Sequence, residues 1–126
     1  MSAHTPQILV ADDDPEIRKL LGRYIEAQAF RVLLASSCGE LRERIATNRI
    51  DLIVLDVLLP DGSGLNACRD LRAERNTIPI ILLTAKVQYE DVLGGYKLGA
   101  DYYITKPFTS TQLINGINLL LGEGKS

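Results

Sequence analysis

The stretch DLIVLD, residues 51–56, is apolar throughout between its two terminal acids. Apolar and polar residues do not alternate along it, which is typical of a strand in a sheet covered on both faces. Comparable short runs occur at residues 7–11 (QILVA), 30–35 (FRVLLA), 78–83 (IPIILL) and 102–105 (YYIT). We therefore predict five strands, with DLIVL at residues 51–55 in the middle of a parallel sheet.

Segments with helical spacing of apolar residues separate these strands. After Asp14, which suits a helix N-cap, and Pro15, which suits the first helical turn, apolar residues recur every three or four positions from Ile17 to Ile25. Further helices are predicted over about 39–48, 65–75, 89–98 and 110–121. We expect residues 60–64 (PDGSG) to form a loop, because proline and glycine disrupt both regular structures.

Strands alternating with helices predict an α/β fold with a doubly wound, five-stranded parallel sheet. The flavodoxin-like strand order 2-1-3-4-5, a (βα)5 arrangement with right-handed crossovers, accommodates five such units. The carboxyl ends of parallel strands meet at one edge of the sheet. That edge should gather polar residues that follow four of the strands, namely Asp12, Asp13, Asp56, Thr84 and Lys106. The second strand ends without a charged residue, which agrees with its place at the border of the sheet.

Length and composition indicate one domain over residues 1–126, with an ordered core at about 7–122. The formal net charge of −2 provides no electrostatic reason to expect binding to nucleic acid or to an anionic membrane. No apolar run reaches the roughly 20 residues of a membrane span, and the first residues do not resemble a signal segment. Cys38 and Cys68 lack metal-site spacing, and Cys68 shares helical spacing with Leu65 and Leu71, which predicts a buried thiol. We expect a cytoplasmic protein.

Clustered carboxylates at the sheet edge would need a cation. Two carboxylates about 4 Å apart repel by roughly 4 kcal/mol at an effective dielectric constant of 20. Lys106 can offset one charge, and the remainder favours a hard divalent ion, Mg²⁺ or Mn²⁺. Simpler interpretations exist for each residue alone: the acids at 12–14 could cap a helix, Lys106 could be a solvated surface lysine, and Thr84 could be an ordinary strand residue.

Four segments together carry a family resemblance, namely QILVADDDPEIRKLL (7–21), DLIVLDVLLPDGSGL (51–65), IPIILLTA (78–85) and LGADYYITKPF (98–108). In them the chain resembles the receiver domain of bacterial two-component response regulators. The resemblance implies that Asp56 is the phosphoacceptor. It further implies that Asp13 binds Mg²⁺ directly, that Asp12 acts mainly through water, and that the backbone carbonyl of Leu58 is a third protein ligand.

The same resemblance implies a conformational switch. Thr84 would bond one phosphoryl oxygen and Lys106 another, with a cis peptide bond between Lys106 and Pro107. Tyr103 would swing inward as Thr84 moves toward the phosphoryl group. The alternative interpretation is that Tyr103 is a static, half-buried aromatic residue. The surface that reports phosphorylation would be made by residues 89–98, 102–105 and 110–121.

The implied function is a phosphorelay switch rather than an enzyme that turns over a metabolite. A sensor histidine kinase or a phosphotransfer protein would donate the phosphoryl group, and a downstream effector domain or protein would respond. The domain itself would bind neither nucleic acid nor membrane. A homodimer formed on phosphorylation is left open, because Gln112, Gly116 and Asn118 replace charges that one dimerising subgroup of the family carries, while the run 119–121 is apolar.

Other functions remain as alternatives. A pseudo-receiver would bind partners without phosphorylation. A Mg²⁺-dependent phosphohydrolase of the haloacid dehalogenase kind needs a second acid two residues after its nucleophile, where this chain has Leu58. A flavodoxin needs a phosphate-binding loop after the first strand, where the acids at 12–14 would repel phosphate. No effector domain follows the last predicted helix, so we expect either a single-domain regulator or a piece of a longer chain.

Overall fold

A five-stranded parallel sheet forms the centre of the molecule, in a computed structural model that describes residues 5–85 and 99–122. The strand order is β2-β1-β3-β6-β7, and every neighbouring pair is parallel. The strands of this sheet are β1 (Gln7–Ala11), β2 (Arg31–Ala35), β3 (Leu52–Asp56), β6 (Ile80–Ala85) and β7 (Tyr102–Lys106). In order along the chain this is the predicted arrangement 2-1-3-4-5, so the predicted α/β fold is confirmed.

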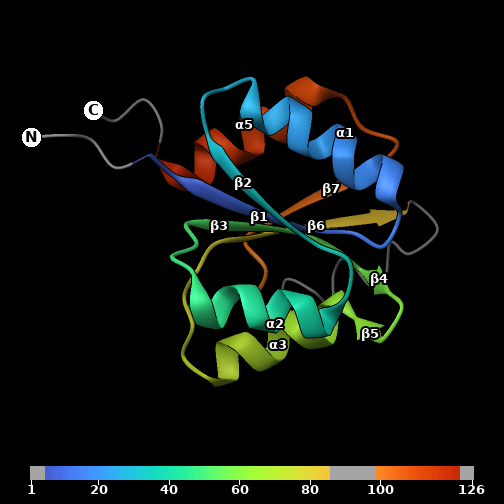
Figure 1. Cartoon of the computed structure of the whole chain (residues 1–126), viewed down its shortest axis with the longest axis vertical. Coiled ribbons are helices and arrows are strands. Elements are labelled where there is room, and N and C mark those ends of the chain that lie inside the picture. The colour runs from blue at the N-terminus through green and yellow to red at the C-terminus, as the bar shows by residue number, and fades with distance from the viewer. Residues whose placement is uncertain (1–4, 86–98, 123–126) are drawn as a thin grey trace, which may run out of the picture.

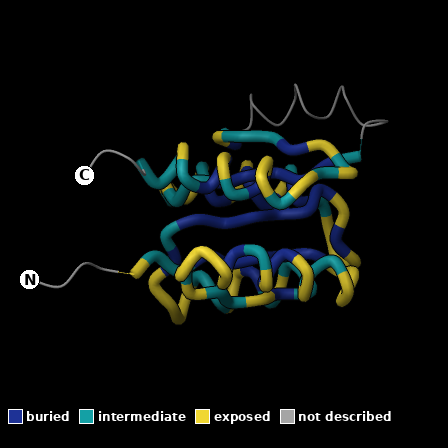
Figure 2. The backbone as a smooth tube through the Cα atoms, turned by 90° about the horizontal axis from the view of Figure 1, so that it is seen from above, coloured by how far each residue is buried: buried dark blue, intermediate teal, exposed yellow. Residues whose placement is uncertain are grey.

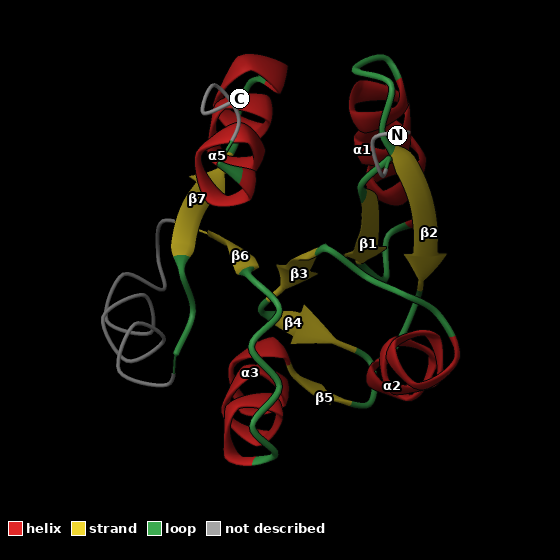
Figure 3. Cartoon of the chain, turned by 90° about the vertical axis from the view of Figure 1, so that its left-hand side faces the viewer, coloured by secondary structure: helices red, strands yellow, loops and turns green. Residues whose placement is uncertain are grey.

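Helices cover both faces of the sheet (Figures 1 and 3). On one face lie α1 (Pro15–Glu26) and α5 (Ser110–Leu121), and on the other lie α2 (Cys38–Thr47) and α3 (Gly64–Ala73). Figure 2 shows the buried strands between helices whose outward sides are exposed. The helix predicted over 89–98 lies outside the described residues. None of the described helices is long and apolar enough to cross a membrane.

The central strand β3 explains why its sequence is apolar without alternation. Its side chains point alternately to the two faces, and all five residues are buried. Leu52 and Val54 belong to the hydrophobic core beneath α1 and α5, whereas Ile53 and Leu55 belong to the core on the side of α2 and α3. Each such fully buried side chain stabilises the fold by about 1.5–3 kcal/mol. Cys68 is also fully buried, as its helical spacing predicted.

Local side-chain bonds fix where the helices begin and end. The Asp14 carboxylate accepts hydrogen bonds from the backbone N–H groups of Glu16 (2.9 Å) and Ile17 (3.4 Å), which confirms it as the N-cap of α1. Helix α3 ends at Ala73, two residues earlier than predicted, and Arg75 then adopts a left-handed φ of 66°. The other described helix and strand boundaries differ from the predicted ones by at most two residues, as expected where helices fray and strands end.

The segment predicted to be only a loop contains a small hairpin, so that prediction was wrong in part. Strands β4 (Leu58–Leu59) and β5 (Gly62–Ser63) pair antiparallel, and Pro60 and Asp61 form the turn between them. Proline is tolerated here because it lies in the turn, where its preset φ is favourable and no ladder hydrogen bond requires its missing N–H. The residues that were expected to interrupt regular structure therefore form the tight turn of a hairpin.

Gly64 allows α3 to start close against the end of β3. Its N–H donates a hydrogen bond of 2.7 Å to the Val57 carbonyl. A Cβ atom at this position would lie 2.2 Å from the backbone oxygen of Asp56, far inside van der Waals contact. The close approach of two backbones thus requires glycine.

We expect Gly64→Ala to lower the free energy of unfolding by about 1–3 kcal/mol, because the added methyl group must displace the backbone of β3. Urea denaturation would measure the change. Gly22→Ala in α1 is the matched control, since its Cβ would make an ordinary 3.7 Å contact with Leu34. It should raise stability by up to about 1 kcal/mol through helix propensity. Equal effects of the two substitutions would contradict the close-approach argument.

Candidate functional site

The carboxyl edge of the sheet gathers the polar residues predicted to meet there. Asp12 follows β1 directly, and Asp56 is the last residue of β3. Thr84 is the second-to-last residue of β6, and Lys106 is the last residue of β7. The pairing register aligns these strand ends, because Ala11 of β1 pairs with Leu55 of β3, and Asp56 of β3 pairs with Leu83 of β6. Residues separated by almost a hundred positions along the chain therefore share one site.

Three carboxylates form the acidic part of this site. One oxygen atom from each of Asp12, Asp13 and Asp56 lies within 4.8 Å of the other two. Asp12 is fully buried and Asp56 is 6% exposed, whereas Asp13 is exposed to solvent. The cluster is thus reached from solvent on the side of Asp13.

Lys106 supplies a positive charge to this cluster. Its Nζ donates a 3.1 Å hydrogen bond to Asp56 Oδ2 and lies 3.5 Å from Asp12 Oδ2. Burial by itself would lower the pKa of Lys106, but the hydrogen bond and charge of Asp56, together with the charge of Asp12, outweigh it and raise the pKa. Lys106 is therefore a charged partner of both acids, and not a freely solvated surface lysine.

Hydrogen bonds hold Asp12 in place, whereas its carboxylate oxygen Oδ2 pairs with the Lys106 ammonium at 3.5 Å without a hydrogen bond. The N–H of Asp14 donates a 2.9 Å hydrogen bond to Asp12 Oδ1, and an Arg18 guanidinium nitrogen donates a 2.7 Å bond to the Asp12 carbonyl. Burial, followed by the charge of Asp56, raises the pKa of Asp12 against the lowering effects of the Asp14 N–H and Lys106. Asp12 Oδ2 is buried without a hydrogen-bond partner in the described part of the chain. A buried carboxylate oxygen that makes no hydrogen bond and lies beside two other acids fits a divalent metal ion, because the one charge of Lys106 does not neutralise three carboxylates.

Leu58 is placed beside Asp56 through its backbone. Its N–H donates a 3.1 Å hydrogen bond to Asp56 Oδ1, so both oxygen atoms of that carboxylate have an assigned donor, from Leu58 or from Lys106. Leu58 is 61% exposed and does not belong to either hydrophobic core. Leu58 therefore borders the site through its backbone and not through its side chain.

Thr84 and Tyr103 lie on the same face of the sheet. Tyr103 is opposite Leu82, and Thr84 follows Leu82 by two residues, so all three project to the face that carries α2 and α3. Thr84 is 1% exposed and its hydroxyl donates a 3.3 Å bond to the Ala85 carbonyl. The Tyr103 ring packs against the core of that face with its hydroxyl oxygen buried.

The peptide bond between Lys106 and Pro107 is cis, as the family resemblance implied.

The amino-acid sequence did not predict a role for Arg18, which holds the main chain of Asp12. Its signal was weak: a long cationic side chain one turn into α1 can reach back to the strand end, but exposed arginines on helices are common.

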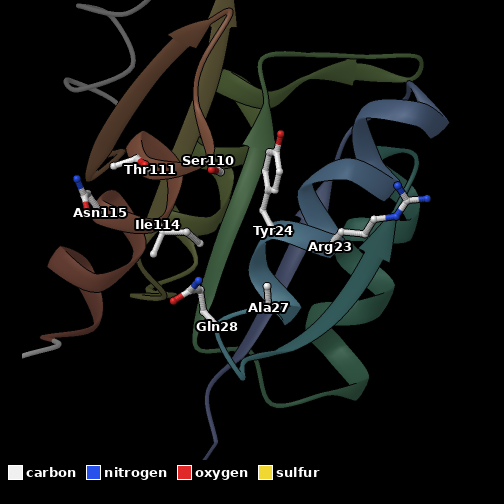
Figure 4. A pocket seen from close by; sticks show the side chains of 8 residues that line it. All are labelled: Arg23, Tyr24, Ala27, Gln28, Ser110, Thr111, Ile114 and Asn115. Carbon is white, nitrogen blue, oxygen red and sulfur yellow. The ribbon is translucent and has the colours of Figure 1, made fainter.

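A separate hollow of about 310 Å³ lies between α1 and α5 (Figure 4). Arg23 and Tyr24 from α1, and Ser110 and Ile114 from α5, are among its lining residues. None of the site residues lines it, and its described lining residues carry no carboxylate, thiol or imidazole group. The candidate site is therefore the edge of the sheet where Asp12, Asp13, Asp56 and Lys106 cluster, and not this hollow.

Comparison with known proteins agrees with this geometry. A sequence model described as the response regulator receiver domain matches residues 8–118. The chain belongs to this family. Receiver domains are signalling modules of two-component systems, so the receiver described here is a signalling module of that kind, and its acidic cluster stands where receivers bind Mg²⁺.

Two curated relatives show how the receiver compares with longer proteins. The chain is 40% identical over 123 residues to the transcriptional regulatory protein GltR of Pseudomonas aeruginosa, covering 96% of this chain and 51% of GltR. It is 39% identical over 121 residues to the protein PetR of Rhodobacter capsulatus, with the same two coverages. The chain thus spans about half the length of the curated relatives that it matches.

A solved structure shows the same fold. The receiver domain of the Francisella response regulator 1452 superimposes with a TM-score of 0.89 at 34% sequence identity, covering 96% of this chain and 100% of that one.

Removing the ammonium group of Lys106 should destabilise the receiver in the absence of divalent ions. We expect Lys106→Met to lower the free energy of unfolding by about 1–3 kcal/mol, because Asp12 and Asp56 then repel each other without a cation. Urea denaturation in EDTA measures this, and adding Asp56→Asn should restore part of the loss. Lys19→Met on the exposed side of α1 is the control and should stay within about 0.5 kcal/mol. A Lys106→Met variant as stable as wild type would contradict the charge argument.

Proposed function

We propose that this receiver accepts a phosphoryl group on Asp56 in a Mg²⁺-dependent reaction and uses it as a phosphorelay switch. The observation that carries the proposal is the arrangement around Asp56: its carboxylate is bonded to Lys106 at 3.1 Å and grouped with Asp12 and Asp13 within 4.8 Å. Sites for phosphoryl transfer need this combination of an oxygen nucleophile, a metal-binding acid pair and a fixed cation.

The proposed donor is a phosphohistidine of a sensor histidine kinase or of a phosphotransfer protein. One carboxylate oxygen of Asp56 attacks phosphorus, and a P–O bond forms while the P–N bond of the phosphohistidine breaks. The electron pair of the broken bond goes to the imidazole nitrogen. The product is an aspartyl phosphate, and nothing is oxidised or reduced. Asp56 suits this role because it is 6% exposed, at the open edge of the sheet, and held by two donors.

The residues that would hold Mg²⁺ are Asp13, Asp12, Asp56 and the backbone carbonyl of Leu58. We assign Asp13 as the direct ligand and Asp12 as a ligand acting mainly through water. When bound, Mg²⁺ (or Mn²⁺) neutralises the carboxylates and the charge that develops on the phosphoryl oxygens. Three carboxylates with one ammonium leave the site with excess negative charge, which would otherwise repel an incoming phosphoryl donor.

Lys106 and Thr84 are proposed to recognise the product. Lys106 Nζ already lies beside Asp56 and would pair with one phosphoryl oxygen. The Thr84 hydroxyl now donates a long bond of 3.3 Å to its neighbouring carbonyl, a bond that is easily exchanged for a charge-assisted bond to a second phosphoryl oxygen. Arrival of the dianion would thus pull the end of β6 toward Asp56.

Tyr103 is the proposed relay from this movement to the surface. It shares a sheet face with Thr84 and packs on the core beside it, so displacement of Thr84 changes the space next to the ring. The surface that reports the change would comprise β7, α5 and residues 89–98. Reversing a 1:99 equilibrium completely takes about 5.5 kcal/mol of differential binding, of which new charge-assisted bonds to a dianion supply a large part.

The proposed output is control of an effector domain or of a separate partner protein, without contact between this domain and nucleic acid. The names of relatives such as a transcriptional regulatory protein, and their greater length, support an effector domain. A phosphorylation-dependent homodimer remains within the proposal, because Leu119 on α5 is 65% exposed and the described part of α5 bears no charged side chain.

Direct labelling tests the proposal. Incubation with Mg²⁺ and acetyl phosphate should add about 80 Da, one HPO₃ unit, to the intact protein. Asp56→Asn should abolish the gain because the nucleophile is lost, and EDTA should suppress it in the wild type. Asp70→Asn, on the exposed side of α3, is the control and should label normally. An unlabelled wild type, or an equal mass gain in Asp56→Asn, would refute the assignment and favour a pseudo-receiver.

The relay predicts a separation between labelling and response. We expect Tyr103→Ala to label at Asp56 but to lose most of the phosphorylation-dependent change in amide hydrogen exchange of β7 and α5, because the ring that transmits the change is missing. Tyr102→Phe is the control, since Tyr102 packs against Gly116 on the opposite face of the sheet. A full exchange response in Tyr103→Ala would remove Tyr103 from the mechanism.

A further inference from the structure

The hairpin β4–β5 joins the phosphorylation site to α2 through one side chain. Asp61, in the turn of the hairpin, reaches across to the first turn of α2. Its Oδ1 accepts a 2.7 Å hydrogen bond from the Cys38 N–H, and its Oδ2 accepts a 3.0 Å bond from the Gly39 N–H. Both carboxylate oxygens therefore bind backbone groups that lie 23 and 22 residues away along the chain.

These bonds have a chemical reason to form. The first N–H groups of a helix have no partner within the helix, and the helix dipole favours a negative charge at this end. The hydrogen bond from Cys38, followed by that from Gly39, lowers the pKa of Asp61. The carboxylate is thus the charged acceptor that this helix end prefers.

Helix α2 nevertheless has a cap of its own. The Ser37 hydroxyl oxygen accepts a 3.1 Å bond from the Glu40 N–H, and the Glu40 carboxylate in turn accepts bonds from the N–H (2.7 Å) and hydroxyl (2.8 Å) of Ser36. The start of α2 is therefore specified by its own residues. What Asp61 adds is a connection between the helix and the hairpin.

The hairpin has few other anchors. Each of its strands is two residues long, and the Leu58 side chain is 61% exposed. Leu59, 8% exposed, packs into the core, and the base of the hairpin is held where Gly64 bonds Val57. The far end is held by Asp61. The Leu58 peptide, whose N–H bonds Asp56 Oδ1, lies between these two attached ends.

We propose that Asp61 is a positioning residue for the phosphorylation site. By tying the hairpin turn to the N-terminus of α2, it holds the Leu58 backbone where its N–H orients Asp56 and its carbonyl serves as a metal ligand. The role of the carbonyl rests on the function proposed above. The two hydrogen bonds of the Asp61 carboxylate go to α2 and not to the proposed metal ligands or the reacting carboxylate, so we infer that Asp61 acts through β4.

Comparing Asp61→Ala with Ser37→Ala separates positioning from helix capping. Both variants remove a side-chain cap from the same end of α2, but only Asp61→Ala releases the hairpin. Isothermal titration calorimetry would measure the Mg²⁺ dissociation constant, and intact-mass spectrometry the rate of labelling by acetyl phosphate. We expect Asp61→Ala to weaken Mg²⁺ binding and slow labelling by about tenfold each, as is common when an outer-shell partner is lost. Ser37→Ala should leave both near wild-type values.

Asp61→Asn keeps one acceptor oxygen and should fall between wild type and Asp61→Ala. It also serves in place of Asp61→Ala should circular dichroism show that variant unfolded at the assay temperature. Wild-type Mg²⁺ affinity in the Asp61 variants, or an equal loss in Ser37→Ala, would overturn the positioning role. A wild-type protein that binds Mg²⁺ without labelling at Asp56 would instead refute the proposed function, and the affinity comparison would still decide the role of Asp61.

Discussion

Repulsion among three carboxylates at the edge of the sheet is the constraint on which this structure depends. Asp12 and Asp56 are buried beside each other, Asp13 joins them from the solvent side, and Lys106 is the ammonium group placed against them. Such a cluster is stable only while its charge is offset. Under the proposed function, the excess negative charge and the fixed cation would draw in a divalent ion and then a phosphoryl group, so the repulsion within the cluster and its proposed role have one physical origin.

The surrounding fold supplies the means of holding these charges together. Two hydrophobic cores clamp the sheet from both faces, and β3 contributes side chains to each. The central strand therefore cannot shift without disturbing both cores, and Asp56 at its end is fixed accordingly. Gly64 and the hairpin then complete the site on the α3 side, where backbone approaches backbone too closely for any other residue.

Most of the fold could be predicted from the sequence, because hydrophobic spacing and helix-capping residues depend only on neighbouring residues along the chain. Apolar runs such as 51–55 indicate buried strands, and Asp14 before Pro15 indicates a helix start. Once strands and helices alternate, few topologies remain, and the parallel arrangement places strand ends together. The meeting of Asp12, Asp56, Thr84 and Lys106 at one edge follows from that topology, and the structure bears it out. The roles proposed for them in phosphoryl transfer rest on the family resemblance and on the chemistry of the cluster.

The amino-acid pattern alone was sufficient for the sheet, its order and the acidic edge, since hydrophobic periodicity and chain connectivity are read along the chain. It was not sufficient for the hairpin at 58–63 or for the bonds from Asp61 to α2 and from Arg18 to the Asp12 carbonyl. Those contacts depend on the direction in which particular side chains point across space. A proline and two glycines predict a break in regular structure, but the turn they form and the helix that it meets depend on how the neighbouring elements pack.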